Sequence, residues 1–279
     1  MVANIAGIEE VNVETWEEFE KELSDLFCDN DPEWLFRGHN NSEWKLEATL
    51  DRILNRGNQE PNLYHHATLE GYYNLMINIL PRVEEETGRT WSNMPAFSEY
   101  RNRLSKCQIS GLFNELPGYE FMAYLRHHGF PSPLLDWTSS PFIAAFFAFG
   151  EDTDAQQVSI HAYRERTPCL ATKELSLAAR IVNLDNNARM HKRHFLQQSH
   201  YTISVENIMD GSVVYVSHEE AMKRSEGLRV TVRKYCIPSG ERDKVLNTLR
   251  RYNLNSFSLF GTVESLMETL WSDFGLVRP

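Results

Sequence analysis

The sequence predicts an α+β fold, in which a helical front half combines with a mostly antiparallel sheet. Apolar residues in the front half recur every three or four positions, as at 12–28 and 63–90. The back half instead holds β-branched and aromatic runs, such as 158–164 and 200–205. Helices and strands that are segregated along a chain are typical of α+β proteins. Because no repeat, low-complexity tract or linker interrupts the sequence, we expect residues 1–279 to form a single domain.

The first elements follow from local patterns. Residues 12–28 alternate acidic and apolar side chains at helical spacing, and Asn12 or Thr15 is placed to cap that helix. WLFRG at 34–38 is short, apolar and ends in glycine, which indicates a strand. Composition and pattern then assign a helix or turn from 45–54, a loop at 55–62, a long helix at 63–90 that breaks near Pro81, and a polar connection at 91–106.

The middle of the chain predicts two helices around a loop. A helix begins after Pro117 and stops at Gly129, and a second begins at Pro141, where proline fits the first helical position. Between them, residues 131–140 form a turn-rich loop. For the remainder we expect strands at 158–164, 179–184, 200–205, 212–217 and 228–238, and helices at 241–254 and 262–275, the last capped by Thr262 and ended by Gly275.

Composition describes an ordinary globular protein: 42% of the residues are hydrophobic and 24% are charged. The formal net charge of -11 disfavours sequence-independent nucleic-acid binding, which needs clustered lysines and arginines. The N-terminus has no basic start, and the most apolar stretch, 141–150, is too short to span a membrane. The four cysteines are isolated, which indicates reduced thiols. We therefore expect a cytoplasmic protein with no membrane partner and no metal.

Arg37 is the first candidate site residue. It ends an apolar run, Trp34-Leu35-Phe36, and Gly38 follows it. An arginine at the end of a strand, beside a glycine that permits close approach to the backbone, is suited to hold an anion. The alternative is an ordinary surface arginine.

A second group of candidates lies in LRHHGFPSPLLDWTSS, residues 125–140. Loops on a rigid scaffold often carry function. His127 and His128 point apart if they lie on a helix, so they are poorly placed to bind one metal together. The sequence favours a role in stabilising the C-terminus of that helix. Asp136, amid apolar neighbours, is either a buried hydrogen-bond hub or a catalytic group. Ser139 or Ser140 is placed to cap the helix opened by Pro141.

A third group lies in residues 186–205. Arg189, Lys192 and Arg193 form a small basic cluster, which fits either a solvated face or recognition of phosphate or a nucleic-acid backbone. No phosphate-binding P-loop, no dinucleotide-binding glycine fingerprint and no nucleophile-elbow motif is present in the sequence.

Taken together, these stretches resemble the FRG domain family. The tripeptide at 36–38 matches the motif that names the family, and LRHHGFPSPLLDWTSSPFIAAFFA at 125–148 resembles its long central pattern. RHFLQQSHYTI and LNSFSLFGTVESLMETL resemble two later elements, so the matched segments run from about 34 to 270. The departures from the family pattern are Arg126 for glutamine, Ser132-Pro133 for Thr-Arg, Ser199 for glycine and Gly261 for proline.

A more distant resemblance implies a chemistry. An aromatic-Arg-Gly strand end, a later Thr-Ser loop and an acid near the C-terminus follow the order seen in arginine-type ADP-ribosyltransferases, which implies an ADP-ribosyltransferase-like fold and NAD as substrate. Arg37 and Glu264 would be catalytic: Arg37 would hold the NAD phosphates, and Glu264 would stabilise the positive charge on ribose. Glu264 equally fits a first-turn helix residue. The implied substrate-binding residues are Gly38, His127, His128, Asp136, Thr138, Ser139, Gln198 and Tyr201.

Three functions remain open on the sequence. The first is an NAD-consuming enzyme, either an ADP-ribosyltransferase with a protein or nucleic-acid target or an NAD glycohydrolase, of the kind found in bacterial toxins and phage defence. The second is a non-catalytic module that binds a nucleotide or a partner. The third is a nucleic-acid-processing enzyme that uses the basic cluster at 189–193, against which the net charge of -11 argues.

Overall fold

One mixed sheet organises the chain. The structure, a computed structural model, describes residues 2–5, 8–27, 34–56, 67–110, 117–165, 179–184, 192–208, 212–224 and 230–274. Within these residues nine strands form a sheet of order β1-β2-β9-β5-β3-β4-β7-β6, with β8 beside β7. β2 and β9 run parallel, and the other strand pairs are antiparallel. The predicted α+β class, with a mostly antiparallel sheet, is confirmed.

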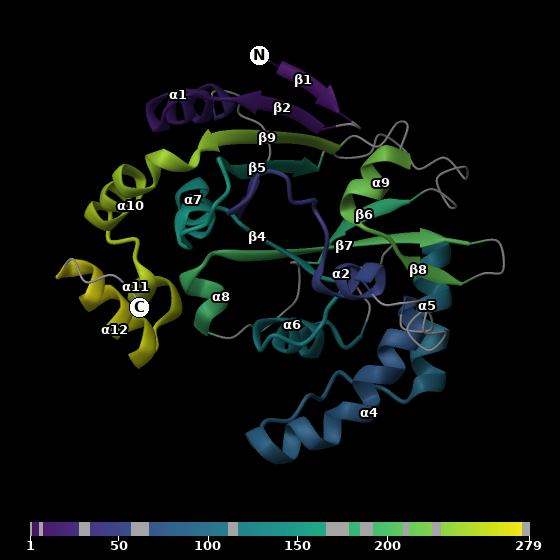
Figure 1. Cartoon of the computed structure of the whole chain (residues 1–279). Coiled ribbons are helices and arrows are strands. Elements are labelled where there is room, and N and C mark those ends of the chain that lie inside the picture. Colours follow the sequence, from purple (N-terminus) through teal and green to yellow (C-terminus); the bar gives the residue numbers. More distant parts are fainter. Residues whose placement is uncertain are drawn as a thin grey trace.

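The elements, labelled in Figure 1, have the following bounds. The strands are β1 Val2–Ile5, β2 Ile8–Asn12, β3 Leu35–His39, β4 Leu135–Thr138, β5 Gln157–Glu165, β6 Arg180–Asn183, β7 Ser199–Asn207, β8 Val213–Tyr215 and β9 Val230–Pro238. The helices are α1 Trp16–Leu26, α2 Thr49–Arg56, α4 Leu69–Thr87, α5 Phe97–Ser110, α6 Tyr119–His127, α7 Pro141–Phe149, α8 Lys192–Leu196, α9 His218–Arg224, α10 Arg242–Arg251, α11 Ser256–Phe260 and α12 Val263–Asp273.

Helices cover the sheet in three groups, each with its own buried cluster. Phe36 belongs to the cluster beneath α1, α7 and α10, while its neighbour Leu35 belongs to the cluster beside α9. Successive side chains of a strand point to opposite faces, so this division shows that both faces of β3 are buried. A third cluster joins α4, α5 and α6 to β7 and β8. In Figure 1, α7 lies under β5, while α10, α11 and α12 gather beside it at the left.

Capping residues place the helix starts close to where the sequence predicts them. The Thr15 side chain accepts the backbone N–H of Glu18, so Thr15 and not Asn12 caps α1. Ser140 caps α7 with Pro141 at the first helical position. Thr262 caps α12 in a reciprocal capping box with Ser265. Gly275, the predicted end of that helix, lies outside the described residues.

Three predictions for the front half are wrong. α4 continues through Pro81, since its first half is anchored by buried Tyr72 and Tyr73, and the fixed φ of proline is itself helical. Residues 91–106 are not a polar connection: α5 begins at Phe97, and Tyr100 stacks on Tyr73 with ring centroids 3.7 Å apart. The loop predicted at 131–140 contains the strand β4.

Gly38 is required by the packing of α7 on β3. A Cβ atom at this position would lie 2.0 Å from the carbonyl oxygen of Ala144 and 2.7 Å from the backbone nitrogen of Ala148. Both atoms belong to the backbone of α7, which cannot yield as a side chain can. The close approach that the sequence suggested for a ligand is therefore made by a helix, and a ligand contact at Gly38 stays a prediction.

Gly38→Ala is expected to lower the free energy of unfolding by about 1–3 kcal/mol, the usual cost of overpacking a core. Urea denaturation would measure the loss. Gly240→Ala is the matched control, because no heavy atom lies within 4 Å of a Cβ built there. Equal stability of the two variants would contradict the tight packing of α7 on β3.

Candidate active site

The site begins where the pairing of β3 with β4 stops. These two strands share a single residue pair, Phe36 with Thr138. Beyond it, the guanidinium of Arg37 takes the place of a backbone donor: its Nη1 donates to the carbonyl oxygen of Asp136 at 2.7 Å. On its other side β3 continues along β5, where Arg37 lies opposite His161. Arg37 is therefore built into the sheet at the point where two strands separate.

Asp136 is shared by two arginines. Nε and Nη2 of Arg126 donate to its two carboxylate oxygens at 2.8 and 2.9 Å, the bidentate geometry typical of an arginine–carboxylate pair. Nη1 of Arg37 lies 3.7 Å from Oδ2. Burial would raise the pKa of Asp136, but Arg126 and Arg37 outweigh it and hold that pKa below its usual value. Asp136 is thus an ionised hub, which supports the hydrogen-bond reading of this acid over the catalytic one.

Arg37 is also held from its other side, by a histidine. Its Nε donates to Nε2 of His39 at 3.1 Å. The side chain of Arg37 is 15% exposed. Burial lowers the pKa of Arg37 to about 10, helped by the nearby charges of Arg126 and Arg52 and opposed by Asp136. Arg37 nevertheless remains a cation at neutral pH.

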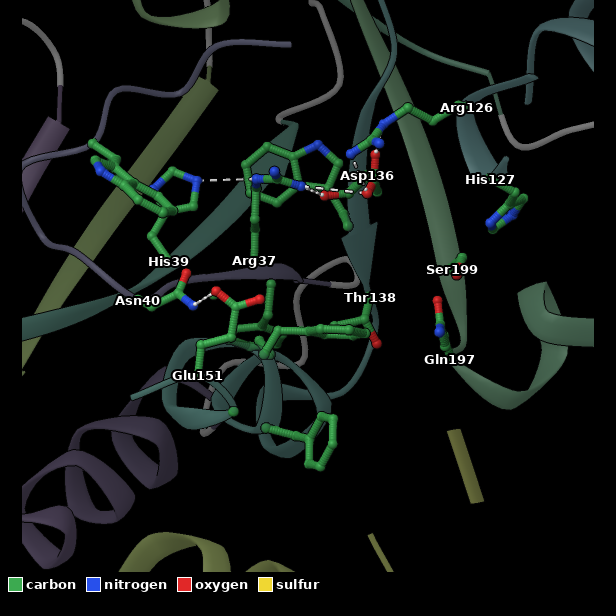
Figure 2. Close-up of a pocket in the computed structure, with 18 of the residues that line it drawn as sticks. Arg37, His39, Asn40, Arg126, His127, Asp136, Thr138, Glu151, Gln197 and Ser199 are labelled. Atoms are coloured by element: carbon green, nitrogen blue, oxygen red, sulfur yellow. Dashed lines mark hydrogen bonds and ion pairs between the residues drawn. The ribbon is translucent and has the colours of Figure 1, made fainter. Parts of the chain in front are cut away.

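These residues line a cavity of about 840 Å³, which falls within the size range of sites for small molecules and cofactors. Figure 2 shows Arg37, Asp136 and Arg126 on one side of this pocket, Asn40, Glu151 and Thr138 on another, and His127, Ser199 and Gln197 opposite. Cations, carboxylates and aromatic rings all line it. The pocket is also lined by Arg52, Arg193, Phe260 and Glu268.

Three arginines are grouped on the wall of this pocket, although the lining as a whole is balanced, with five arginine and lysine side chains and five aspartate and glutamate side chains. The three are Arg37, Arg126 and Arg52, and the charges of the last two lower the pKa of Arg37. Asp136 neutralises one of the three charges. Among the described residues, the guanidinium of Arg52 has no ion-pair or hydrogen-bond partner. An arginine cluster of this kind is a favourable environment for a phosphate or a carboxylate ligand.

Glu151 brings a carboxylate to the same pocket. It follows α7 directly, and its Oε2 accepts a hydrogen bond from Nδ2 of Asn40 at 3.1 Å. Asn40 is itself fixed, because its carbonyl oxygen accepts from the Thr153 hydroxyl at 3.1 Å. Figure 2 shows the Glu151 side chain reaching toward the side of the pocket that Arg37 occupies. The pocket thus offers a positioned acid beside a cluster of cations.

The two histidines of the sequence motif have different surroundings. His127 lines the pocket, and its Nε2 lies 2.5 Å from the hydroxyl of Tyr201. His128 is exposed, follows the last residue of α6 and packs on Tyr124 with ring centroids 4.3 Å apart. It does not line the pocket, and its place at the end of α6 fits the helix C-terminus reading, while its role in substrate binding stays a prediction.

At the Thr-Ser loop and the paired glutamines, the pocket is lined partly by predicted residues and partly by residues next to them in the sequence. Thr138 lines the pocket, but Ser139 does not; its hydroxyl donates to Oε1 of Gln198 at 2.9 Å. Gln198 has φ 46 and also lies outside the lining, so Ser139 and Gln198 are a mutual pair that closes the turn before β7. Gln197 and Ser199 line the pocket instead. The substrate contacts of Ser139 and Gln198 stay predictions.

Tyr201 supports the pocket from within the core. It is fully buried opposite Asp136 on β7, and its ring stacks on His194 with centroids 5.9 Å apart. It is absent from the lining and its hydroxyl contacts His127, so a direct contact with substrate stays a prediction.

Glu264 does not line this pocket, and its predicted catalytic role stays a prediction. It is exposed in the first turn of α12, one residue before the capping-box Ser265. The backbone N–H of Glu264 itself and the Thr262 hydroxyl hold its pKa below the usual value. This is the helix N-terminal role that the sequence equally allowed. Glu268, one turn further along α12, lines the pocket.

Sequence reasoning gave no role to Arg52, Arg126 or Glu151, all of which line the pocket. Arg126 had a visible signal, since it departs from the family pattern two residues before His128. Of the basic cluster, Arg193 is described: its guanidinium lies 4.5 Å from the ring centroid of Phe260, and both line the pocket. Arg189 and the side chain of Lys192 lie outside the described residues.

The fold and the site define a class: an α+β protein in which β3, α2 and α6 each bring an arginine to the wall of a ligand-sized pocket. Residues 32–157 match the model of the FRG domain, which confirms the resemblance to the FRG domain family over this part of the chain. It includes Arg37, Arg52, Arg126, Asp136 and Glu151. No curated protein and no solved structure matches the chain. The expected extension of the domain to residues 1–279 and the ADP-ribosyltransferase-like fold stay predictions.

Two features are absent from the described residues, a membrane-spanning helix and a cluster of metal ligands. None of the helices there combines the length and the apolar character needed to cross a membrane. No group of three or more histidine, cysteine, aspartate or glutamate side chains is arranged there to hold a metal ion. Of the four cysteines, Cys236 has a described side chain, and it is a buried free thiol.

Asp136→Asn is expected to lower the free energy of unfolding by about 1–3 kcal/mol, because it leaves two partly buried arginines without their counter-charge. Urea denaturation at pH 7 would measure the loss. Asp243→Asn is the control: this acid is 94% exposed and lies 3.9 Å from Arg242, so its loss should change stability by under about 0.5 kcal/mol. A silent Asp136→Asn would exclude the hub role.

Stability should fall with acid because buried histidines stay neutral in the folded state. Burial lowers the pKa values of His161 and His218 to about 3, from a usual 6.5. The unfolded chain therefore binds more protons below about pH 6.5, and each histidine costs about 1.4 kcal/mol of stability per pH unit down to about pH 3. Asp51 opposes this, since burial raises its pKa to about 6 and the folded state gains its proton first, which offsets about one of the two histidines between about pH 6 and pH 4.

Urea midpoints between pH 7.5 and pH 4.5 would test this slope. His218→Gln is the matched variant: the glutamine oxygen can still accept the hydrogen bond that the Thr202 hydroxyl makes to Nε2 of His218, but it does not titrate. We expect its slope to be shallower than the wild-type slope by about one proton. A wild-type stability that is flat across this range would show that these histidines titrate as they do in the unfolded chain.

Proposed function

We propose that this pocket binds NAD and cleaves the bond between nicotinamide and ribose, as an ADP-ribosyltransferase or an NAD glycohydrolase. The observation that carries the proposal is the arginine cluster of Arg37, Arg52 and Arg126, in which Asp136 pairs with Arg37 and Arg126, in a cavity of about 840 Å³. That volume suits a dinucleotide, and the arginine cluster suits its pyrophosphate.

Phosphate binding is assigned to Arg37 and Arg52. Nε and Nη1 of Arg37 are engaged by His39 and Asp136, which leaves Nη2 without a hydrogen-bond partner among the described residues. Arg52 brings a second guanidinium from α2. Two guanidinium groups fixed on separate elements can bracket a pyrophosphate, whose charge neither could neutralise alone.

Bond cleavage is assigned to Glu151. When the bond between C1′ of ribose and the nicotinamide nitrogen breaks, its electron pair leaves with nicotinamide and positive charge builds on the sugar. A fixed carboxylate beside that carbon stabilises the charge, as in glycosidases. Water or an acceptor group then bonds to C1′ and releases a proton. Glu151 suits this step since Asn40 holds one carboxylate oxygen and leaves the other for the sugar.

Two polar side chains complete the proposed site. The Thr138 hydroxyl accepts the backbone N–H of Ser140 at 3.2 Å, so its own proton remains to be donated to a ribose hydroxyl. His127, held by Tyr201, lies across the pocket from it in Figure 2. A cytoplasmic setting, a protein or nucleic-acid target for transfer, and a role as a toxin or in phage defence belong to the same proposal.

A non-catalytic nucleotide-binding module is the second candidate. It is favoured by Asp136, the carboxylate closest to Arg37, whose charge is fully engaged by two arginines. Such a module keeps the arginine cluster and needs no acid at Glu151. It predicts NAD binding without release of nicotinamide.

Glu151→Gln is expected to reduce nicotinamide release at least about 100-fold, the usual cost of removing one group that stabilises a transition-state charge. Mass spectrometry of purified protein mixed with NAD, with and without cell lysate, would read both free nicotinamide and ADP-ribose adducts. Glu264→Gln is the matched control, because it removes an exposed carboxylate outside the pocket and should leave the rate unchanged.

The outcomes separate the candidates. Binding of NAD by the wild type without any release would favour the module. Release that survives Glu151→Gln but is lost in Glu264→Gln would overturn the proposed site in favour of the helix α12 acid. Neither binding nor release would remove NAD as the ligand.

A further inference from the structure

His39 is a buried residue next to the proposed phosphate site that the function above does not use. It ends β3, is 5% exposed, and stands two residues after Arg37 on the same strand. Its ring meets the ring of His161 edge to face, with centroids 4.8 Å apart, and the ring of Trp44 lies 6.1 Å away. Nε2 of this ring faces Nε of Arg37 at 3.1 Å.

That contact fixes the proton arrangement of His39. An arginine Nε always carries hydrogen and can only donate, so Nε2 of His39 must present its lone pair. The ring is then neutral, and its single proton resides on Nδ1. A protonated ring would set two N–H groups against each other and place a second cation beside Arg37. The charged or titratable groups around the ring, His161 on β5, Arg37 on β3 and Arg52 on α2, all disfavour that cation.

We infer that His39 is the positioning residue that aims Arg37 at the ligand, by holding the guanidinium through its unprotonated Nε2. The arginine is then fixed at two points, Nε by His39 and Nη1 by the carbonyl oxygen of Asp136. Together with the covalent bond from Nε to the rest of the side chain, these two contacts fix the plane of the guanidinium, and Nη2 is the nitrogen that remains for a ligand. The inference rests on the proposed function in that the ligand is taken to carry phosphate.

A histidine suits this position because its Nε2 lies close enough to accept a hydrogen bond from Nε of Arg37. The Asp136 contacts hold Nη1 alone and leave the guanidinium free to turn about that point. Fixing Nε removes this freedom before the ligand arrives, so that binding does not have to order the side chain. A neutral imidazole does this without adding a charge that would cancel the attraction for an anion, which a carboxylate in its place would do.

The test uses two variants of similar size. In His39→Gln the amide oxygen falls near the place of Nε2 and can accept from Arg37; in His39→Asn the shorter amide falls near Nδ1 and cannot. Titration calorimetry with NAD and with inorganic pyrophosphate would give the affinities. We expect His39→Gln to stay within about threefold of the wild type and His39→Asn to lose about tenfold for both probes, as expected for one hydrogen bond to a charged group.

A spectroscopic measurement decides the positioning independently of any ligand. In nitrogen-15 spectra, His39 of the wild type should show an unprotonated Nε2 and a protonated Nδ1, and Arg37 a protected Nε–H signal, assigned by its loss in Arg37→Lys. That signal should persist in His39→Gln and exchange rapidly in His39→Asn. An imidazole protonated on Nε2, or an Arg37 signal indifferent to both variants, would overturn the inference.

The two proposals fail differently. If the wild type binds neither NAD nor pyrophosphate, the proposed function falls, while the spectra still decide whether His39 holds Arg37. If both probes bind with equal affinity to all three proteins, the pocket stands and the positioning role of His39 is wrong.

Discussion

The pocket depends on how Arg37 meets Asp136. Strands β3 and β4 pair through one residue pair, after which a side chain takes over from the backbone: the Arg37 guanidinium binds both the carbonyl oxygen and, more loosely, the carboxylate of Asp136. A buried carbonyl without a partner is costly, so this contact allows the two strands to part without an unmet hydrogen bond. The pocket lies where the two strands separate, and the Arg37 guanidinium that allows them to separate also lines the pocket.

The charges around this contact explain why the arginines can lie close together and why they still favour an anion. Asp136 lets Arg37 and Arg126 approach each other, and its carboxylate is kept ionised by both. The remaining charge, with Arg52, is left for an anion. The pocket is not built by the FRG segment alone, since Arg193, Gln197 and Phe260 lie beyond residue 157 and line the opposite wall. The C-terminal helices α11 and α12 are therefore part of the pocket wall.

The sequence predicted the elements whose cause is local and missed those whose cause lies elsewhere in the chain. Thr15, Ser140 and Thr262 cap helices because capping needs only their neighbours. Arg37 could be singled out, because a cation after an apolar run is visible in one line of sequence. β4 was missed since four residues become a strand only beside β7. Glu151 was not singled out, since its position in the sequence does not show that it faces the cavity. Register and distance across strands are tertiary facts.

The parallel pairing of β2 with β9 has a consequence for how the protein is made. Glu9 and Arg233 form an ion pair across these strands although 224 residues separate them. A chain emerging from the ribosome therefore holds β2 with an open edge until β9 has left the exit tunnel, and long-range pairings of this kind are slow to form. The cavity closes later still, because Glu268 belongs to its wall. Nascent chains consequently expose an unpaired edge of β2 until β9 has been made, and the pocket is complete only after Glu268 has been added.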